Sequence, residues 1–154
     1  MLKNLRLAIS LLILVAVVAG AALIIDLSGT STCGFRDDKT VTINGQKLKV
    51  EVASTDAARV QGLSGRQCIG QSEAMLFIFN QSGYYQFWMK DMNFPIDIIW
   101  ISSAHKAIAL ERKAQPSSYP EKFVNQDAPA QYVLEMAAGR STSLGMTQGT
   151  IVNF

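Results

Sequence analysis

Residues 39–54 read KTVTINGQKLKVEVAS, and this stretch decides how the fold is interpreted. Apolar residues alternate with Thr, Lys and Glu on both sides of the pair Asn44-Gly45. A period of two places alternate side chains on opposite faces of a strand, and Asn-Gly is a preferred pair for a two-residue type I′ turn. The stretch therefore predicts a β-hairpin whose Val, Ile and Leu residues face a core.

Short strands and turns also follow the hairpin. Ser54 or Thr55 can cap a short helix that runs through Val60 or Gln61 and ends at Gly62. Residues 115–130 hold three of the four Pro residues and predict a long surface loop. Further strands are expected at residues 74–80, 84–90, 97–102, 106–114, 131–139 and 151–154.

Many short strands separated by frequent turn signals are typical of all-β architectures. We therefore predict a mainly β chain: a single compact antiparallel β-sandwich or barrel-like domain with one or two short helices. This domain is expected to span residues 39–154, after a polar stalk at residues 26–38 and an apolar leader at residues 1–25.

The leader is uncharged from Leu7 to Ile25 and follows Lys3 and Arg6. As a helix it would be about 28 Å long, close to the roughly 30 Å hydrocarbon core of a bilayer. We favour an uncleaved transmembrane helix over a signal peptide or a lipoprotein acylated at Cys33. The basic N-terminal side predicts a cytoplasmic N-terminus and an extracytoplasmic C-terminal domain, which would be secreted or periplasmic if the leader is cleaved.

Charge and cysteine content narrow the function classes. Residues 26–154 carry twelve Lys and Arg and twelve Asp and Glu, so no basic footprint for nucleic acid is present. With His105 as the single His and no paired-Cys spacing, we predict no metal site, and no motif implies a cofactor. Cys33 and Cys68 would face an oxidising compartment; both a disulfide and two thiols remain open.

Five motifs occur in order along residues 39–154: AARVQGLSGR, AMLFIF, FWMKDMNFPIDIIWI, PAQYVLEMAAG and LGMTQGTIV. The chain resembles the bacterial and archaeal family known as domain of unknown function 192 (DUF192). The resemblance implies a small β-rich domain, often exported behind a signal peptide or anchor, and implies no reaction. The family usually carries Asn-Thr where this chain has Asp91-Met92, so a mechanism that depends on that Asn amide would not carry over.

Residues 87–100, FWMKDMNFPIDIIW, mix large apolar side chains with ionisable ones. One interpretation is structural: the aromatics form core, while Lys90, Asp91 and Asp97 close a turn. The other is a small-molecule cleft in which Trp88 stacks on a ligand. In that cleft Lys90, Asn93 and Asp97 would supply the polar contacts.

Two more ionisable residues belong to the predicted site. Arg59 either pairs with a carboxylate such as Asp56 or Glu135, or holds an anionic ligand group. Glu135 shares a strand face with Val133 and needs a partner if it is buried. The candidate binding residues are Arg59, Trp88, Lys90, Asn93, Asp97 and Glu135.

We therefore predict a membrane-tethered extracytoplasmic domain that binds a small polar or saccharide-like envelope ligand or a partner protein. The alternative is a hydrolase-like enzyme with Asp97 and Glu135 as acid and base, which requires both carboxyl groups to face one cavity. A scaffold that docks through an exposed aromatic turn is the third possibility.

Overall fold

The computed structural model describes residues 33–154, which form one compact unit. The predicted transmembrane helix at residues 7–25 lies outside the described residues. Within residues 33–154 no helix is long and apolar enough to cross a membrane.

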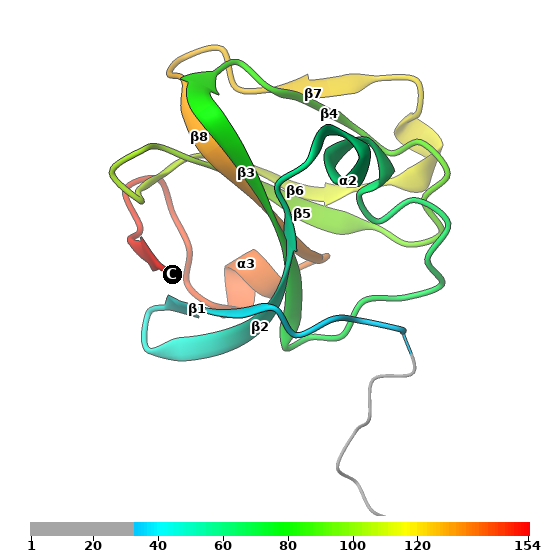
Figure 1. The fold of residues 1–154 in the computed structure, drawn as a ribbon, viewed down its shortest axis with the longest axis horizontal. Helices are drawn as coiled ribbons and strands as arrows, with labels where there is room; N and C mark the ends of the chain where they lie inside the picture. The colour runs from blue at the N-terminus through cyan, green and yellow to red at the C-terminus, as the bar shows by residue number, and fades with distance from the viewer. Residues whose placement is uncertain (1–32) are drawn as a thin grey trace, which may run out of the picture. The chain divides into compact units, whose positions relative to one another are not determined.

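A strongly curled seven-stranded sheet dominates the fold (Figure 1). Its strand order is β6-β5-β8-β3-β2-β1-β9, and β4 and β7 form a separate two-stranded sheet. The strands are β1 Lys39–Ile43, β2 Gln46–Ala53, β3 Glu73–Gly83, β4 Gln86–Trp88, β5 Ile96–Ile101, β6 Ala107–Ala114, β7 Lys122–Val124, β8 Ala130–Ala137 and β9 Val152–Asn153. Two short α-helices, α2 Asp56–Gln61 and α3 Arg140–Ser143, and a 3-10 turn, η1 Pro116–Ser118, complete the described elements.

The prediction of a mainly β domain with one or two short helices is confirmed, since two are found, but the sheet is a half-barrel and is not wholly antiparallel. Strand β2 pairs with β3 in parallel, with Val50 beside Ala74 and Val52 beside Leu76. A parallel pair needs a crossover connection between its strands. Here α2 and the loop that follows it provide the crossover, which places that helix beside the sheet.

The local predictions at the hairpin and the first helix are confirmed. Strands β1 and β2 meet at Asn44 and Gly45, which have φ values of 48° and 79°, as a type I′ turn requires. The Thr55 side chain accepts a hydrogen bond from the Ala58 N–H at the start of α2, and Gly62 ends the helix with φ 48°. The loop predicted at residues 115–130 is different: it contains η1 and the short strand β7, whose three residues carry too little pattern to be detected.

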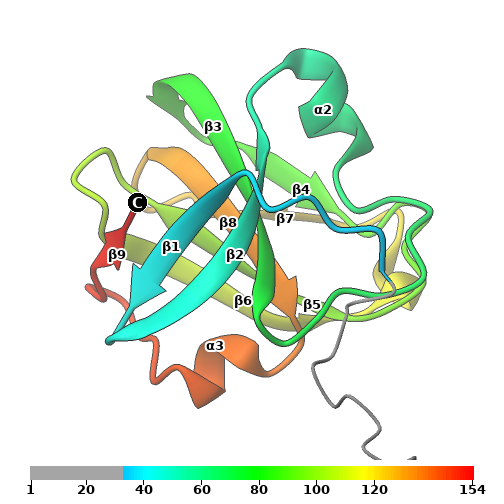
Figure 2. The ribbon, with the colours of Figure 1, turned by 60° about the horizontal axis from the view of Figure 1, so that its bottom comes forward.

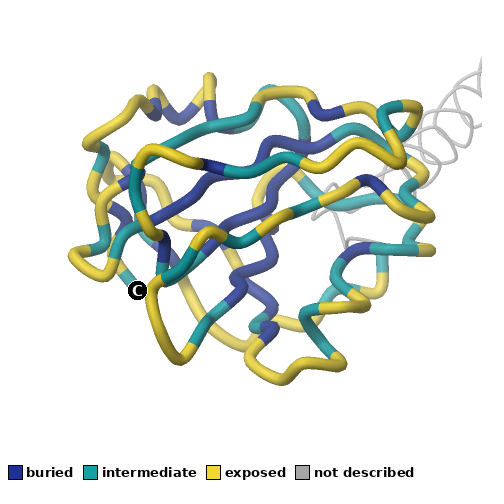
Figure 3. The backbone as a smooth tube through the Cα atoms, turned by 90° about the horizontal axis from the view of Figure 1, so that it is seen from above, coloured by how far each residue is buried: buried dark blue, intermediate teal, exposed yellow. Residues whose placement is uncertain are grey.

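The sheet separates two hydrophobic clusters. The first lies inside the curl, where Val41, Leu76, Ile99 and Leu134 pack with the segment after α3. The second lies on the other face of β3, β8 and β5, under α2, β4 and β7 (Figure 2). The buried backbone accordingly runs through the central strands, and the exposed residues gather in the loops (Figure 3).

Asp97 is fully buried on β5 and ties three elements together. Its Oδ1 accepts hydrogen bonds from the N–H groups of Lys113 (2.9 Å) and Gly139 (3.0 Å). Its Oδ2 accepts them from the N–H (2.9 Å) and the hydroxyl (2.7 Å) of Ser141. A carboxylate with four donors is a satisfied structural group that holds β6 and the start of α3 against β5.

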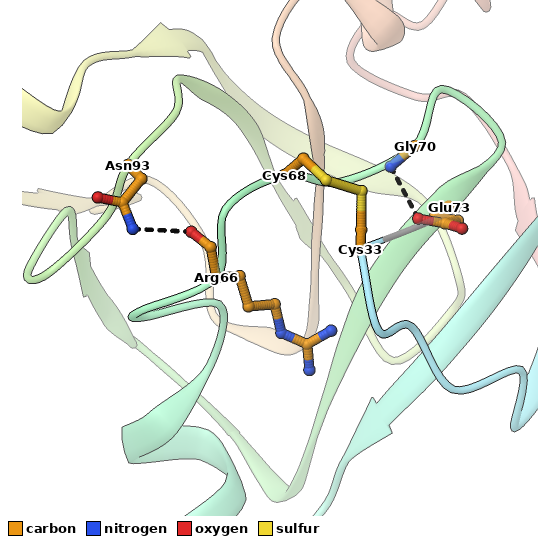
Figure 4. The surroundings of a disulfide bond; sticks show 6 residues. All are labelled: Cys33, Arg66, Cys68, Gly70, Glu73 and Asn93. Atoms are coloured by element: carbon orange, nitrogen blue, oxygen red, sulfur yellow. Dashed lines mark hydrogen bonds between the residues drawn. A yellow bond between two sulfur atoms is a disulfide. The ribbon is translucent and has the colours of Figure 1, made fainter. Parts of the chain in front are cut away.

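Of the two alternatives for the cysteines, a disulfide or two thiols, the structure has the disulfide: Cys33 is bonded to Cys68, and their Cα atoms are 5.3 Å apart. Figure 4 shows it joining the segment before β1 to the loop between α2 and β3. The same loop is held by Arg66, whose guanidinium donates to Glu51 Oε1 at 2.8 Å and whose carbonyl accepts from Asn93 Nδ2 at 2.8 Å. The crossover between β2 and β3 is therefore anchored by the disulfide to the segment before β1 and by Arg66 to Glu51 and Asn93.

We predict that Asp97→Ala lowers the free energy of unfolding by about 3 kcal/mol or more, because four donors lose their buried acceptor. Urea unfolding followed by circular dichroism measures the change. Glu121→Ala, at an exposed carboxylate, is the matched control. A loss at Asp97 no larger than the control's would contradict the structural role.

Candidate functional site

A cavity of about 310 Å³ opens between α2, its following loop and β4, over the outer face of β3 and β8. We call it the α2–β4 pocket. Its volume is at the lower end of the range typical of small-molecule sites. It is lined by Asp56, Arg59, Val60, Gln61, Gly62, Leu63, Ser64, Phe77, Phe79, Tyr85, Gln86, Phe87, Trp88, Met92 and Glu135.

Aromatic rings form the walls of the pocket and are locked against one another. Phe77 meets Phe87 edge to face with ring centroids 4.9 Å apart, and Phe79 stacks on Tyr85 with centroids 3.5 Å apart. The Tyr85 hydroxyl donates to the Gln81 carbonyl at 2.6 Å. Contacts within the protein therefore hold the aromatic walls of the pocket in place.

Glu135 lines the pocket and is 5% exposed. Strand register places it beside Met75 of β3 and Ile98 of β5, so its nearest neighbours in the sheet are apolar. Within residues 33–154 its carboxyl group makes no hydrogen bond or ion pair with the protein. Burial away from water disfavours the charged form and raises the pKa of Glu135 to about 8.

Arg59 lines the pocket but does not pair with Glu135. One guanidinium nitrogen donates to the carbonyls of Ser54 (2.6 Å) and Ile78 (2.8 Å), and the other donates to Asp56. The guanidinium carbon lies 5.2 Å from the centroid of the Phe79 ring. Of the two partners weighed from sequence, Asp56 is the one found, and these bonds make Arg59 part of the pocket wall.

Trp88 stands at the mouth of the pocket with 40% of its surface exposed. The ammonium of Lys122 lies 5.8 Å from its ring centroid. Lys90 does not line the pocket; it lines a smaller neighbouring hollow of about 260 Å³ together with Trp88, Val60 and Asp91. The Lys90 carbonyl accepts a hydrogen bond from the Ser64 hydroxyl at 2.8 Å.

Two predicted site residues lie away from the pocket. Asn93 donates its amide to the Arg66 carbonyl, which explains it as a brace of the crossover loop (Figure 4). Asp97 pairs with Met136 across β5 and β8, whereas Glu135 pairs with Ile98. Directly opposed residues share a face and consecutive residues alternate, so Asp97 and Glu135 point to opposite faces of the sheet. The two carboxyl groups do not face one cavity.

The sequence prediction thus located Arg59, Trp88 and Glu135 at the pocket and missed most of its walls. Phe77 and Phe79 alternate with Leu76 and Ile78 on β3, and this alternation could have placed them on one face. It could not show that this was the face of Glu135, because that depends on the pairing of β3 with β8. Among residues 33–154 no group of three or more His, Cys, Asp or Glu side chains is arranged to hold a metal ion.

Comparison with known proteins identifies the family. The chain belongs to the domain of unknown function 192 family (DUF192), described as an uncharacterized ACR, whose model matches residues 39–154. A search of curated proteins found no match.

Two solved structures share the fold. A protein of unknown function from Novosphingobium aromaticivorans DSM 12444 is 28% identical, with a TM-score of 0.70 over 75% of this chain and 84% of that one. A protein from Sinorhizobium meliloti 1021, provisionally described as a transcription regulator, is 28% identical, with a TM-score of 0.68 over 74% of this chain and 89% of that one.

We predict that Glu135 makes the folded chain less stable as the pH rises. Its folded-state pKa of about 8 lies above the ordinary 4.5, so its contribution is fully present below pH 4.5 and is lost as the pH approaches 8. The difference in unfolding free energy between the wild type and Glu135→Gln is expected to fall by a few kcal/mol over this window, since one pKa unit corresponds to about 1.4 kcal/mol.

Urea unfolding at intervals between pH 4.5 and 8.5 measures this difference, which isolates Glu135 from the other titrating groups. Glu121→Gln, at an exposed position, is expected to differ from the wild type by the same small amount at every pH. If the difference in unfolding free energy between the wild type and Glu135→Gln were equally independent of pH, the Glu135 carboxyl group would not be desolvated.

Proposed function

We propose that this DUF192 domain is a binding module that takes a small polar or saccharide-like ligand into the α2–β4 pocket. The observation that carries the proposal is Glu135, a residue 5% exposed that lines an aromatic pocket and whose carboxyl group has no hydrogen bond or ion pair within residues 33–154. A pocket lined mostly by apolar and aromatic side chains with a few polar groups is the usual composition of a small-molecule site.

Each wall has a role in the proposed binding. Trp88 offers a half-exposed ring face at the mouth, on which a sugar ring or another flat ligand can stack. Glu135 provides a polar anchor at depth, and the backbone-bound Arg59 closes one side. Lys90, in the adjoining hollow, can reach an anionic group of a ligand that extends past Trp88.

The partner-protein form of the prediction has less support. The exposed large apolar side chains of residues 33–154 are scattered over several elements: Val60, Tyr84, Trp88, Tyr119 and Ile151. Only Val60 and Trp88 of these line the α2–β4 pocket. The hydrolase-like alternative has no supporting geometry, because Asp97 is saturated by four donors on the other face.

We also propose that the domain acts outside the cytoplasm, tethered through residues 7–25. The Cys33–Cys68 disulfide supports this, because disulfides persist in oxidising compartments and are rare in the cytosol. The tether itself rests on the uncharged leader and the basic residues that precede it.

The ligand proposal is tested by titrating the full-length chain, purified in non-ionic detergent, with D-glucose, D-glucosamine and N-acetyl-D-glucosamine and following tryptophan fluorescence and calorimetric heat. Trp88→Ala is expected to weaken binding at least about fivefold, since it removes the stacking face. Tyr119→Ala, at an exposed aromatic residue that does not line the pocket, is expected to leave it unchanged. Equal effects of the two variants would place any binding elsewhere.

Localisation is tested with a thiol-reactive polyethylene glycol maleimide in cells that express the full-length chain. We expect labelling of Cys33 and Cys68 only after reduction. A variant that lacks residues 1–25 and stays in the cytoplasm is expected to label without reduction. Labelling of the full-length chain without reduction would contradict an extracytoplasmic domain.

A further inference from the structure

We infer that the α2–β4 pocket selects ligands that carry an ammonium group, which pairs with Glu135 while the ligand body rests against the aromatic walls. This inference rests on the proposed binding function and narrows it to a chemical class that includes amino sugars and other small organic amines. It follows from the lack of a partner for the Glu135 carboxyl group among residues 33–154.

The first step concerns the missing partner. Glu135 is 5% exposed and lines the cavity, and its carboxyl group makes no hydrogen bond or ion pair with any of residues 33–154. A buried carboxyl group without a partner is unfavourable, and buried charges in proteins are usually paired. A cation that enters with a ligand would provide the partner that the fold leaves out.

The cationic side chain that lines the pocket, Arg59, already has partners. Arg59 donates to two backbone carbonyls and to Asp56, and its guanidinium lies over Phe79. Moving it to Glu135 would leave the Ser54 and Ile78 carbonyls without this donor. The structure therefore keeps Arg59 in the wall and leaves Glu135 free to accept from a ligand.

The charges around the pocket favour a cation. Arg59 (+1) and Asp56 (−1) balance each other in the lining, so the net charge falls from zero to −1 when Glu135 ionises above its pKa of about 8, as pairing with a cation would promote. Strand register adds two carboxylates on the same face of the sheet, Glu51 on β2 and Glu111 on β6. Glu51 is paired with Arg66, and the β3 and β5 neighbours of Glu135 are apolar.

The remaining lining suits the same ligand class. The face of an aromatic ring carries negative electrostatic potential and attracts organic cations, as in the aromatic cages that hold ammonium groups. Phe77, Phe87 and Trp88 line the cavity, whereas Phe79 is covered by Tyr85 and Arg59, and the Tyr85 hydroxyl donates to the Gln81 carbonyl. An anionic ligand would meet Glu135 and Asp56 and find Arg59 already bonded.

The test compares 2-phenylethylamine with 2-phenylethanol, which have the same ring and chain and differ in the ammonium group. Isothermal titration of the full-length chain in non-ionic detergent at pH 7 is expected to show at least tenfold tighter binding of the amine. Because ion pairing lowers the pKa of Glu135, amine binding should release protons, seen as heats that vary with the ionisation enthalpy of the buffer. The affinity for the amine should rise between pH 6 and pH 9.

Glu135→Gln is expected to abolish the preference for the amine, whereas Glu111→Gln, on the same face but outside the pocket, is expected to retain it. The pH dependence of the wild type tests the same point without a substitution. Equal affinities for the two probes, or tighter alcohol binding that weakens as Glu135 ionises, would overturn the ammonium inference and leave the proposed pocket function standing. No binding of either probe, together with no binding of the saccharides, would overturn both.

Discussion

The pairing of β8 with β3 on one side and β5 on the other is the constraint on which the rest of this structure depends. Once both neighbours of a strand are hydrogen-bonded, the face of every side chain on it is determined. Leu134 and Met136 enter the inner core, and Val133 and Glu135 face outward beneath α2 and β4. Asp97 lies on the neighbouring strand β5 opposite Met136, so its side chain points to the inner face.

Two buried carboxyl groups on adjacent strands therefore have opposite environments. Asp97 meets three backbone N–H groups and a hydroxyl, and it joins β5 to β6 and α3. Glu135 meets apolar strand neighbours and an aromatic cavity, without a partner from the described residues. Satisfied polar groups specify a fold, whereas an unsatisfied one beside a preformed cavity is a local inconsistency that proteins retain at functional sites.

Local signals in the sequence accounted for much of the fold. The Asn44-Gly45 turn, the Thr55 cap, the Gly62 stop and the alternation of β1 and β2 depend on interactions within a few residues, and each was predictable. The parallel pairing of β2 with β3 was not, because strand direction depends on the path of the intervening crossover. Strand β7 was not predicted because three residues are too few to show a period of two. Its extended conformation is stabilised by pairing with β4, which the local sequence does not reveal.

The candidate site divides in the same way. By itself the sequence determined that Trp88, Arg59 and Glu135 are chemically unusual for their surroundings, since an aromatic residue among charges and a carboxylate in an apolar strand are visible in one dimension. Only the tertiary structure decided that these three line one pocket, that Asn93 braces a loop and that Asp97 is structural. The physical reason is that side-chain identity and period are local properties. Which faces meet, and which donor reaches which acceptor, depends on pairings between strands that lie tens of residues apart.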